Sequence, residues 1–217
     1  MSEPVLYGYW RSSAAYRVRI ALNLKGIACR QASVHLVRDG GEQHAARYRE
    51  LNPQGLVPTF VDGEAVVTQS IAILEYLEET VPAPALLPAG AAQRARVRAL
   101  SLIVACDIHP LQNLRVLNTL RDRHGVDDEA RADWVRYWIT EGLRAFEAML
   151  AHSPDTGVFC HGDTPGFADV CLVPQIYNAV RWGCDPGDFP TIRRINGACL
   201  ELDAFRRAAP EAQPDAA

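Results

Sequence analysis

In the N-terminal part of the chain, apolar residues alternate between short runs typical of strands and the spacing typical of helices. Residues 5–9 form an apolar and aromatic run, which predicts a buried strand. Residues 15–24 carry apolar side chains on one helical face, with serines before them and Gly26 behind them, as helix ends prefer. A second strand is predicted over residues 29–35. The chain therefore opens as strand, helix, strand.

The next segment predicts a helix, a hairpin and a second helix. The hairpin turns at Gly63-Glu64, and the second helix carries apolar side chains at helical spacing. The order βαβ followed by αββα is that of a thioredoxin-like domain, which we place at residues 1–82. The predicted elements are residues 42–51, 57–62, 65–68 and 69–80.

Residues 81–88 carry three prolines and therefore predict a linker that breaks the preceding helix. After the linker the apolar spacing is helical, and no strand pattern of comparable strength appears. We expect an all-helical domain over residues 90–217, interrupted near Pro110. Its last ten residues are polar and rich in alanine and proline, so we expect a frayed end. The predicted helices cover residues 97–111, 133–151, 167–182 and 191–205.

The composition is that of an ordinary globular protein. The 217 residues are 48% hydrophobic and 22% charged, which excludes collagen-like, mucin-like and largely disordered classes. No apolar stretch approaches the ~18 residues that a membrane span needs. The N-terminus lacks the pattern of a signal peptide, so we expect a cytoplasmic protein. A net charge of -4 disfavours binding to nucleic acid.

Cysteine and histidine spacing excludes the common metal and redox sites. The six cysteines include no Cys-x-x-Cys pair, and no histidine has a partner at ligand spacing. We therefore expect reduced thiols and no metal. The chain also lacks the HExxH, GxSxG and phosphate-loop patterns of the hydrolases and nucleotide-binding enzymes.

Three loops carry residues with a possible chemical role. The bond Val57-Pro58 enters a hairpin strand, where thioredoxin-like domains commonly have a cis proline, and Val57 would then offer its backbone to an extended peptide. Ser70 opens a helix, whose N-terminus attracts anions. Residues 11–17 lead into the first helix, where a hydroxyl of Ser12 or Ser13 and the backbone N–H groups would stabilise a thiolate. An ordinary turn proline and two simple helix caps are the alternatives. No cysteine lies near Ser12, so any thiolate must come from a ligand.

These loops resemble a known family. Residues 12–19 read Ser-Ser-Ala-Ala-Tyr-Arg-Val-Arg. They are similar to the signature of the zeta-class glutathione transferases, in which Ser-Ser-Cys is followed by an aromatic residue and Arg-x-Arg. The chain resembles this class, the maleylacetoacetate and maleylpyruvate isomerases, over nearly its whole length. Further similar segments are residues 52–58, 69–70, 75–79, 108–114 and 168–175.

The resemblance implies a glutathione transferase fold, in which an α/β thioredoxin-like domain is followed by an all-α domain. Glutathione would be the cofactor, and the protein would be a homodimer. A maleyl keto acid would be the substrate, and neither nucleic acid nor membrane would be a partner.

The resemblance also implies the site residues. Ser12 would interact with the glutathione sulfur, and the sequence leaves open whether Ser12 or Ser13 lies nearer to it. Arg11 would act in catalysis and face the substrate carboxylates, with a solvated surface charge as the alternative for each arginine. The implied glutathione site comprises Ser12, Ser13, Gln43, Val57, Pro58, Gln69, Ser70, His109 and Asn113, and the implied substrate site comprises Arg11, Arg115 and Arg181.

Two positions depart from the family pattern. Ala14 stands where the signature has cysteine, and we expect activity to survive because glutathione brings the sulfur. Gly166 stands where the family places threonine, three residues before Asp169, so half of the capping box is missing. A helix start shifted towards Thr164-Pro165 is the alternative.

The implied activity is glutathione-dependent cis–trans isomerisation of maleylpyruvate or maleylacetoacetate in the breakdown of aromatic compounds. One alternative is a general zeta-class transferase acting on halogenated or electrophilic small molecules, which would consume glutathione. The other is a non-catalytic protein of the same fold that binds a partner. The glutathione-site residues argue against this second alternative, because a scaffold needs no such site.

Overall fold

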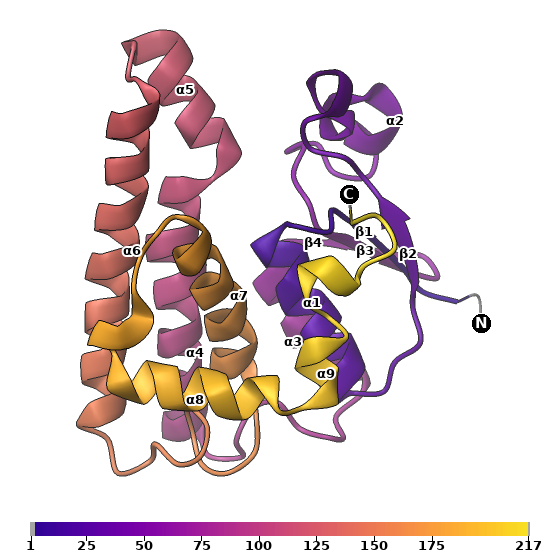
Figure 1. Ribbon diagram of the computed structural model, residues 1–217. Coiled ribbons are helices and arrows are strands. Elements are labelled where there is room, and N and C mark those ends of the chain that lie inside the picture. The colour runs from indigo at the N-terminus through magenta and orange to yellow at the C-terminus, as the bar shows by residue number, and fades with distance from the viewer. Residues whose placement is uncertain (1–2, 217) are drawn as a thin grey trace. The chain divides into compact units, whose positions relative to one another are not determined.

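The computed structural model describes residues 3–216 and divides into two compact units (Figure 1). Unit 1 comprises Met1–Leu86 and Leu200–Ala217, and unit 2 comprises Leu87–Cys199. The first boundary lies in the proline-rich segment. The second differs from the expected division at residues 1–82 and 90–217, because the C-terminal segment packs within unit 1.

Unit 1 contains a sheet of four strands, β1 (Val5–Gly8), β2 (Arg30–Ser33), β3 (Thr59–Asp62) and β4 (Ala65–Thr68). Their order is β2-β1-β3-β4. β1 runs parallel to β2, whereas β3 is antiparallel to both β1 and β4. Leu6 of β1 lies opposite Gln31 of β2 and Phe60 of β3. This mixed sheet confirms the thioredoxin-like topology predicted from the element order.

The helices of unit 1 cover both sides of this sheet. α1 (Ser13–Leu24) and α3 (Ser70–Thr80) lie on one side, and the short α2 (Ala46–Arg49) lies on the other (Figure 1). Ile20 of α1 and Leu74 of α3 are completely buried, as the apolar spacing predicts. The two helices begin next to residues predicted for the site, since Ser12 precedes α1 and Ser70 is the first residue of α3.

A buried ion pair holds the proline-rich segment against unit 1. Lys25 is the only lysine of the chain, and its side chain is completely buried. Its Nζ lies 2.8 Å from Glu78 Oε2 and donates to the carbonyls of Val81 and Pro84. Glu78 in turn accepts the backbone N–H of Leu86. Because every polar atom of the pair has a partner here, the linker segment has a defined path.

Unit 2 is built from helices. None of the helices over residues 3–216 combines the length and apolarity that a membrane crossing requires. The main helices are α4 (Ala91–Leu102), α5 (Leu114–His124), α6 (Asp128–Ala151), α7 (Phe167–Arg181) and α8 (Pro190–Leu200).

The predicted helix over residues 97–111 is interrupted, as Pro110 suggested. α4 ends at Leu102 and continues as a π-helical segment, Ile103–Ile108, and then as the 3-10 segment His109–Gln112. Gly142 of α6 allows the close approach here, because a Cβ at this position would overlap the Ile108 side chain.

α7 begins at Phe167, so the helix start is not shifted towards Thr164-Pro165. The carboxylate of Asp169 accepts the backbone N–H groups of Gly166 at 2.8 Å and Cys160 at 2.9 Å. Burial raises the pKa of Asp169, while these backbone hydrogen bonds lower it. Gly166 has no side chain to accept a hydrogen bond at the N-cap, so α7 keeps only the half of the capping box that Asp169 makes.

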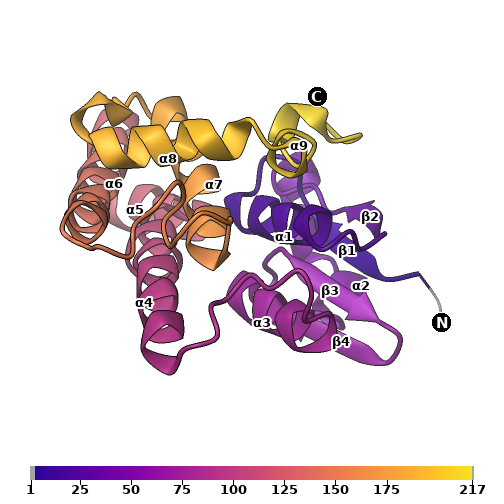
Figure 2. The same ribbon diagram turned by 90° about the horizontal axis from the view of Figure 1, so that it is seen from below.

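The prediction of a frayed C-terminus was wrong for the residues that the structure describes. The chain forms α9 (Asp203–Arg206) and a 3-10 segment, Pro210–Ala212. Phe205 is completely buried, and α9 packs beside α1 (Figure 2). Buried apolar surface and hydrogen bonds to α1 hold a segment whose composition resembles that of a free tail.

Candidate functional site

The turn between β1 and α1 places Ser12 at the N-terminus of a helix. The N–H of Ser12 donates to the carbonyl of Tyr9 at 2.9 Å, which closes the turn. Ser12 Oγ accepts the backbone N–H of Ala15 at 3.2 Å and so caps α1. The cap uses only an oxygen lone pair, so the hydroxyl proton is left for donation to a ligand. Ser12 is half-buried whereas Ser13 is buried, which favours Ser12 as the residue that meets the sulfur.

Arg11 and Trp10 flank this turn. The Arg11 guanidinium lies over the Trp10 ring, 5.3 Å from its centroid, and no carboxylate among the described residues pairs with it. Trp10 Nε1 is buried and has no hydrogen-bond partner in the described part of the chain. A cation without a counter-ion beside an unpaired donor suits an anionic ligand.

The segment that enters β3 exposes a backbone donor and acceptor. The Val57-Pro58 bond is cis, as predicted, and Pro58 is buried. The N–H and C=O of Val57 make no hydrogen bond with residues 3–216. Both groups are therefore available to pair with an extended peptide, as a strand would.

Two side chains that the sequence analysis did not single out fix this segment. Tyr48 Oη donates to the carbonyl of Leu56 at 2.6 Å, and Asn52 Nδ2 donates to the same carbonyl at 2.7 Å. Tyr48 Oη also lies 3.0 Å from Thr59 Oγ1. Burial raises the pKa of Tyr48, so its hydroxyl stays protonated and can donate. Asn52 belongs to the family-like segment 52–58, whereas no local sequence pattern marks Tyr48.

The start of α3 is an open helix N-terminus. No side chain caps α3, so its first backbone N–H groups are available to an anion. Gln69 precedes it with φ 69° and ψ 120°, a left-handed conformation that costs a non-glycine residue about 1–3 kcal/mol. Its Nε2 donates to Gln54 Oε1 at 2.7 Å. Strain of this kind at an uncapped helix start is typical of binding sites.

A buried arginine adds positive charge at the same place. Arg17 of α1 is 2% exposed, and its Nη1 donates to Ser70 Oγ at 3.1 Å. Ser70, predicted to bind a carboxylate, therefore has one protein partner already. The guanidinium reinforces the positive end of α3, and the sequence analysis missed this role because it depends on a tertiary contact.

Gln43 is held by its own loop. Its side chain is buried in the 3-10 segment Glu42–His44, and Nε2 donates to the carbonyl of Leu36 at 3.3 Å. Within the described residues Gln43 Oε1 has no partner. That oxygen is the atom that remains for the predicted contact with glutathione.

The remaining predicted site residues belong to unit 2. Asn113 caps α5 by accepting the N–H of Arg115 at 3.1 Å, and Arg115 is exposed. His109 opens the 3-10 segment that precedes Asn113 and is half-buried. Arg181 ends α7, and its Nη1 donates to Asn178 Oδ1 at 3.2 Å.

An amide network in unit 2 supports Arg181. Asn178 Nδ2 donates to Gln112 Oε1 at 2.5 Å, and Gln112 Nε2 donates to Gln175 Oε1 at 2.8 Å. The network joins the His109–Gln112 segment to α7. It therefore supports both the segment of His109, predicted to contact glutathione, and Arg181, predicted to contact the substrate.

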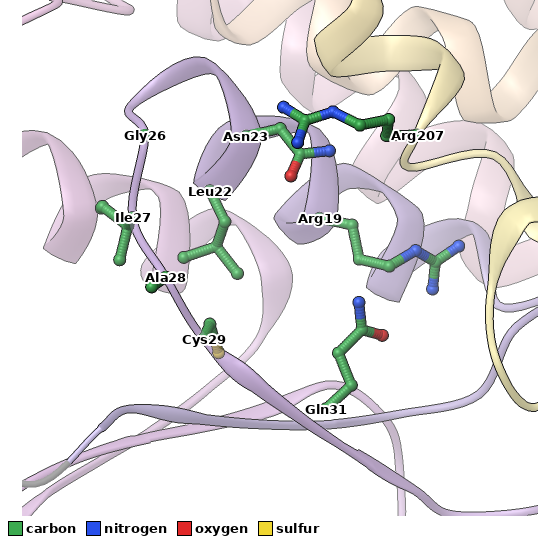
Figure 3. A pocket seen from close by; sticks show the side chains of 9 residues that line it. All are labelled: Arg19, Leu22, Asn23, Gly26, Ile27, Ala28, Cys29, Gln31 and Arg207. Carbon is green, nitrogen blue, oxygen red and sulfur yellow. The ribbon is translucent and has the colours of Figure 1, made fainter.

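A cavity of about 330 Å³ in unit 1 contains none of the predicted site residues (Figure 3). It lies between α1, the loop that leads into β2 and Arg207 of the C-terminal segment. Cys29 lines it, and burial raises the pKa of this thiol to about 11, so it is protonated at neutral pH. The cavity therefore offers no reactive thiolate.

Known proteins share both units of this architecture. Residues 6–85 match the family model "Glutathione S-transferase, N-terminal domain". The maleylacetoacetate isomerase of Rhizobium meliloti is 53% identical over 213 residues, 97% of each chain. The holo structure of a maleylpyruvate isomerase, a bacterial glutathione S-transferase of the zeta class, has a TM-score of 0.95 at 51% identity and covers 98% of this chain and 100% of its own. The maleylacetoacetate isomerase of Methylobacterium extorquens AM1, solved with malonate and glutathione, has a TM-score of 0.94 at 44% identity, covering 98% of this chain and 99% of its own.

The mixed four-stranded sheet of unit 1, the helical unit 2 and the family match place the chain in the glutathione transferase class. Identities near 50% over whole chains narrow this assignment. The chain belongs to the zeta-class family of maleylacetoacetate and maleylpyruvate isomerases.

Proposed function

We propose that the chain is a glutathione-dependent cis–trans isomerase that converts a maleyl keto acid to its fumaryl isomer. The observation that carries the proposal is the Ser12 hydroxyl, which caps α1 through its oxygen and keeps its proton for a ligand. No cysteine lies in this turn, so the protein prepares a thiolate site without supplying the sulfur. The family relatives named for this reaction support the same conclusion.

The residues of unit 1 fit the tripeptide glutathione. The free N–H and C=O of Val57 match its backbone amides, and the uncapped start of α3 suits its γ-glutamyl carboxylate. Gln69, Ser70 and Gln43 stay predicted partners of the same tripeptide. When bound, glutathione supplies a thiol that adds reversibly to the cis double bond, which permits rotation. Ser12 and the α1 N-terminus would hold that thiol in its ionised form.

Arginines are the proposed partners of the substrate. A maleyl keto acid carries two carboxylates, and a chain of net charge -4 needs local positive charge to bind them. Arg11 has no carboxylate partner among the described residues, which suits this role. Arg181 and Arg115 are proposed for the same function, and His109 and Asn113 for contact with glutathione. Malonate, bound with glutathione in the Methylobacterium relative, is also a dicarboxylate.

We further propose a cytoplasmic homodimer that acts in the breakdown of aromatic compounds. The family resemblance supports the homodimer and the role in aromatic breakdown, and the N-terminal sequence pattern supports the cytoplasmic location. Either maleylpyruvate or maleylacetoacetate is an appropriate substrate, since the two differ only in the keto-acid tail.

The deciding experiment follows the ultraviolet absorbance of fresh maleylpyruvate, and separately of maleylacetoacetate, with enzyme in the presence and absence of glutathione. We expect conversion to the fumaryl isomer only with glutathione, whose concentration stays constant. Stoichiometric loss of glutathione would instead show a conjugating transferase. If both maleyl acids stay unchanged, the isomerase proposal fails.

A further inference from the structure

The C-terminal segment returns along α1 towards the turn that carries Ser12. We call residues 208–216 the C-terminal strap. Just before the strap, the carbonyl of Ala204 accepts Nδ2 of Asn23 at 2.9 Å. At the start of the strap, the carbonyl of Ala208 accepts Nε of Arg19 at 3.0 Å. The contacts therefore run backwards along α1, from its C-terminal end to its middle.

The end of the strap reaches β2 and the backbone beside Ser12. Gln31 Nε2 donates to Gln213 Oε1 at 3.1 Å. The carboxylate of Asp215 accepts two hydrogen bonds through Oδ2, from Ser33 Oγ at 2.8 Å and from the backbone N–H of Trp10 at 3.2 Å. Trp10 lies two residues before Ser12. Asp215, near the end of the described chain, is thus hydrogen-bonded to the turn that carries Ser12, the residue proposed to donate a hydrogen bond to the glutathione sulfur.

Arg19 joins the strap to the same turn from the other side. Its guanidinium donates to the carbonyls of Trp10 at 2.9 Å, Tyr9 at 3.5 Å and Ala208 at 3.0 Å. Figure 3 shows Arg19 extending from α1 and Gln31 of β2 pointing towards it. Burial lowers the pKa of Arg19 to about 10 against the opposing charge of Asp215, so the guanidinium is charged at neutral pH.

Hydrogen bonds attach the end of the strap to β2 and to Trp10. A hollow of about 240 Å³ lies between β1, β2 and Pro214 and Asp215. Apolar burial is therefore incomplete where the strap meets Trp10. The two hydrogen bonds to Asp215 consequently make up much of the attachment at this end.

We propose that the C-terminal strap supports the glutathione site from behind the turn, with Asp215 and Arg19 as positioning residues for Ser12. Asp215 holds the N–H of Trp10 and Arg19 holds its C=O, so one peptide segment is fixed from both sides. The carbonyl of Tyr9 accepts both Arg19 and the N–H of Ser12, which transmits the constraint to Ser12. This inference rests on the proposed function, since it concerns the serine assigned to the glutathione sulfur.

The test compares Asp215→Ala and Asp215→Asn with wild-type protein and with Glu201→Ala. Asn keeps an accepting oxygen at the same place, so it is the conservative variant. Glu201 is exposed in the same C-terminal segment, and its removal changes the net charge equally. Each protein is titrated with glutathione by calorimetry. The pKa of the bound thiol is read from thiolate absorbance, and thermal unfolding is recorded separately.

We expect Asp215→Ala to weaken glutathione binding by about three- to tenfold and to raise the pKa of the bound thiol, because the Trp10 segment loses an acceptor and no longer fixes the position of Ser12. Asp215→Asn is expected to recover part of both effects, and Glu201→Ala to match wild type. Wild-type binding and thiol pKa in Asp215→Ala would overturn the proposal, whatever the melting temperature. An equal effect of Glu201→Ala would overturn it too. Failure of the wild-type protein to bind glutathione would instead refute the proposed function.

Discussion

At the scale of single residues, Ser12 combines two tasks in one hydroxyl group. Its oxygen caps α1 by accepting the Ala15 N–H, and the proposed function assigns its proton to the glutathione sulfur. We expect Ser12→Ala to raise the pKa of the bound thiol and to lower kcat by about tenfold or more, because the donor to the thiolate is lost. Loss of the cap costs about 1 kcal/mol as well. Thiolate absorbance against pH, kcat and thermal unfolding measure the three effects.

Two further variants separate the role of Ser12 as the cap of α1 from its proposed contact with the glutathione sulfur. Ser13→Ala is the matched control, since Ser13 is buried and caps nothing, and we expect it to keep the wild-type thiol pKa. Ser12→Asp keeps an oxygen for the Ala15 N–H but repels a thiolate, so we expect near-native unfolding with impaired glutathione binding. A wild-type thiol pKa in Ser12→Ala would assign the sulfur contact to another residue.

At the scale of elements, the segment between α2 and β3 presents the Val57 backbone because Tyr48 and Asn52 hold the preceding carbonyl. Tyr48 comes from α2 and reaches both Leu56 and Thr59. Thr59 is completely buried, and its hydroxyl loses the one side-chain partner that it has within residues 3–216 when the phenol is removed. The segment proposed to bind glutathione and the residues that support it therefore come from different parts of the chain.

We expect Tyr48→Phe to lower the free energy of unfolding by about 1–3 kcal/mol, the cost of a buried polar group left unpaired. Glutathione binding is expected to weaken as well, because Leu56 then depends on Asn52 alone. Chemical denaturation and calorimetry measure the two quantities. Tyr76→Phe is the matched control, since it removes one hydrogen bond to Asp62 at a less buried site. Equal glutathione affinity in Tyr48→Phe and Tyr76→Phe would contradict a special role for Tyr48.

At the scale of the whole molecule, the features set by local sequence pattern could be predicted, whereas those set by contacts between distant residues could not. Hydrophobic spacing predicted the order of strands and helices, because it depends on near neighbours, and the thioredoxin-like order then indicated the cis bond at Val57-Pro58. The ordered C-terminal strap and the support from Tyr48 and Arg17 depend on residues distant in the chain. Composition marked the strap as a frayed tail, since no periodicity shows that a carboxylate near the end of the chain will meet a backbone N–H on a remote turn.

The buried ion pair of Lys25 and Glu78, with the hydrogen bonds from Lys25 to Val81 and Pro84, forms a clamp whose opening can be measured. The Nζ of Lys25 is fully buried and bonded to Glu78, Val81 and Pro84, and it is the only lysine amine in the chain. An amine-reactive reagent can modify this group only when the surrounding core opens. Lys25 is therefore a single built-in reporter of unfolding.

We expect acylation of Lys25 in the native protein to be about a thousandfold slower than in denaturant, the ratio set by a stability of several kcal/mol. Peptide mapping by mass spectrometry measures the two rates. The variant Arg47→Lys supplies an exposed amine in the same unit as an internal reference, and we expect that amine to react at the same rate in both states. Because the clamp joins α1, α3 and the segment leading to unit 2, its opening exposes all three together. Reaction of native Lys25 at the rate of the reference amine would show instead that the linker detaches while the rest of unit 1 stays folded.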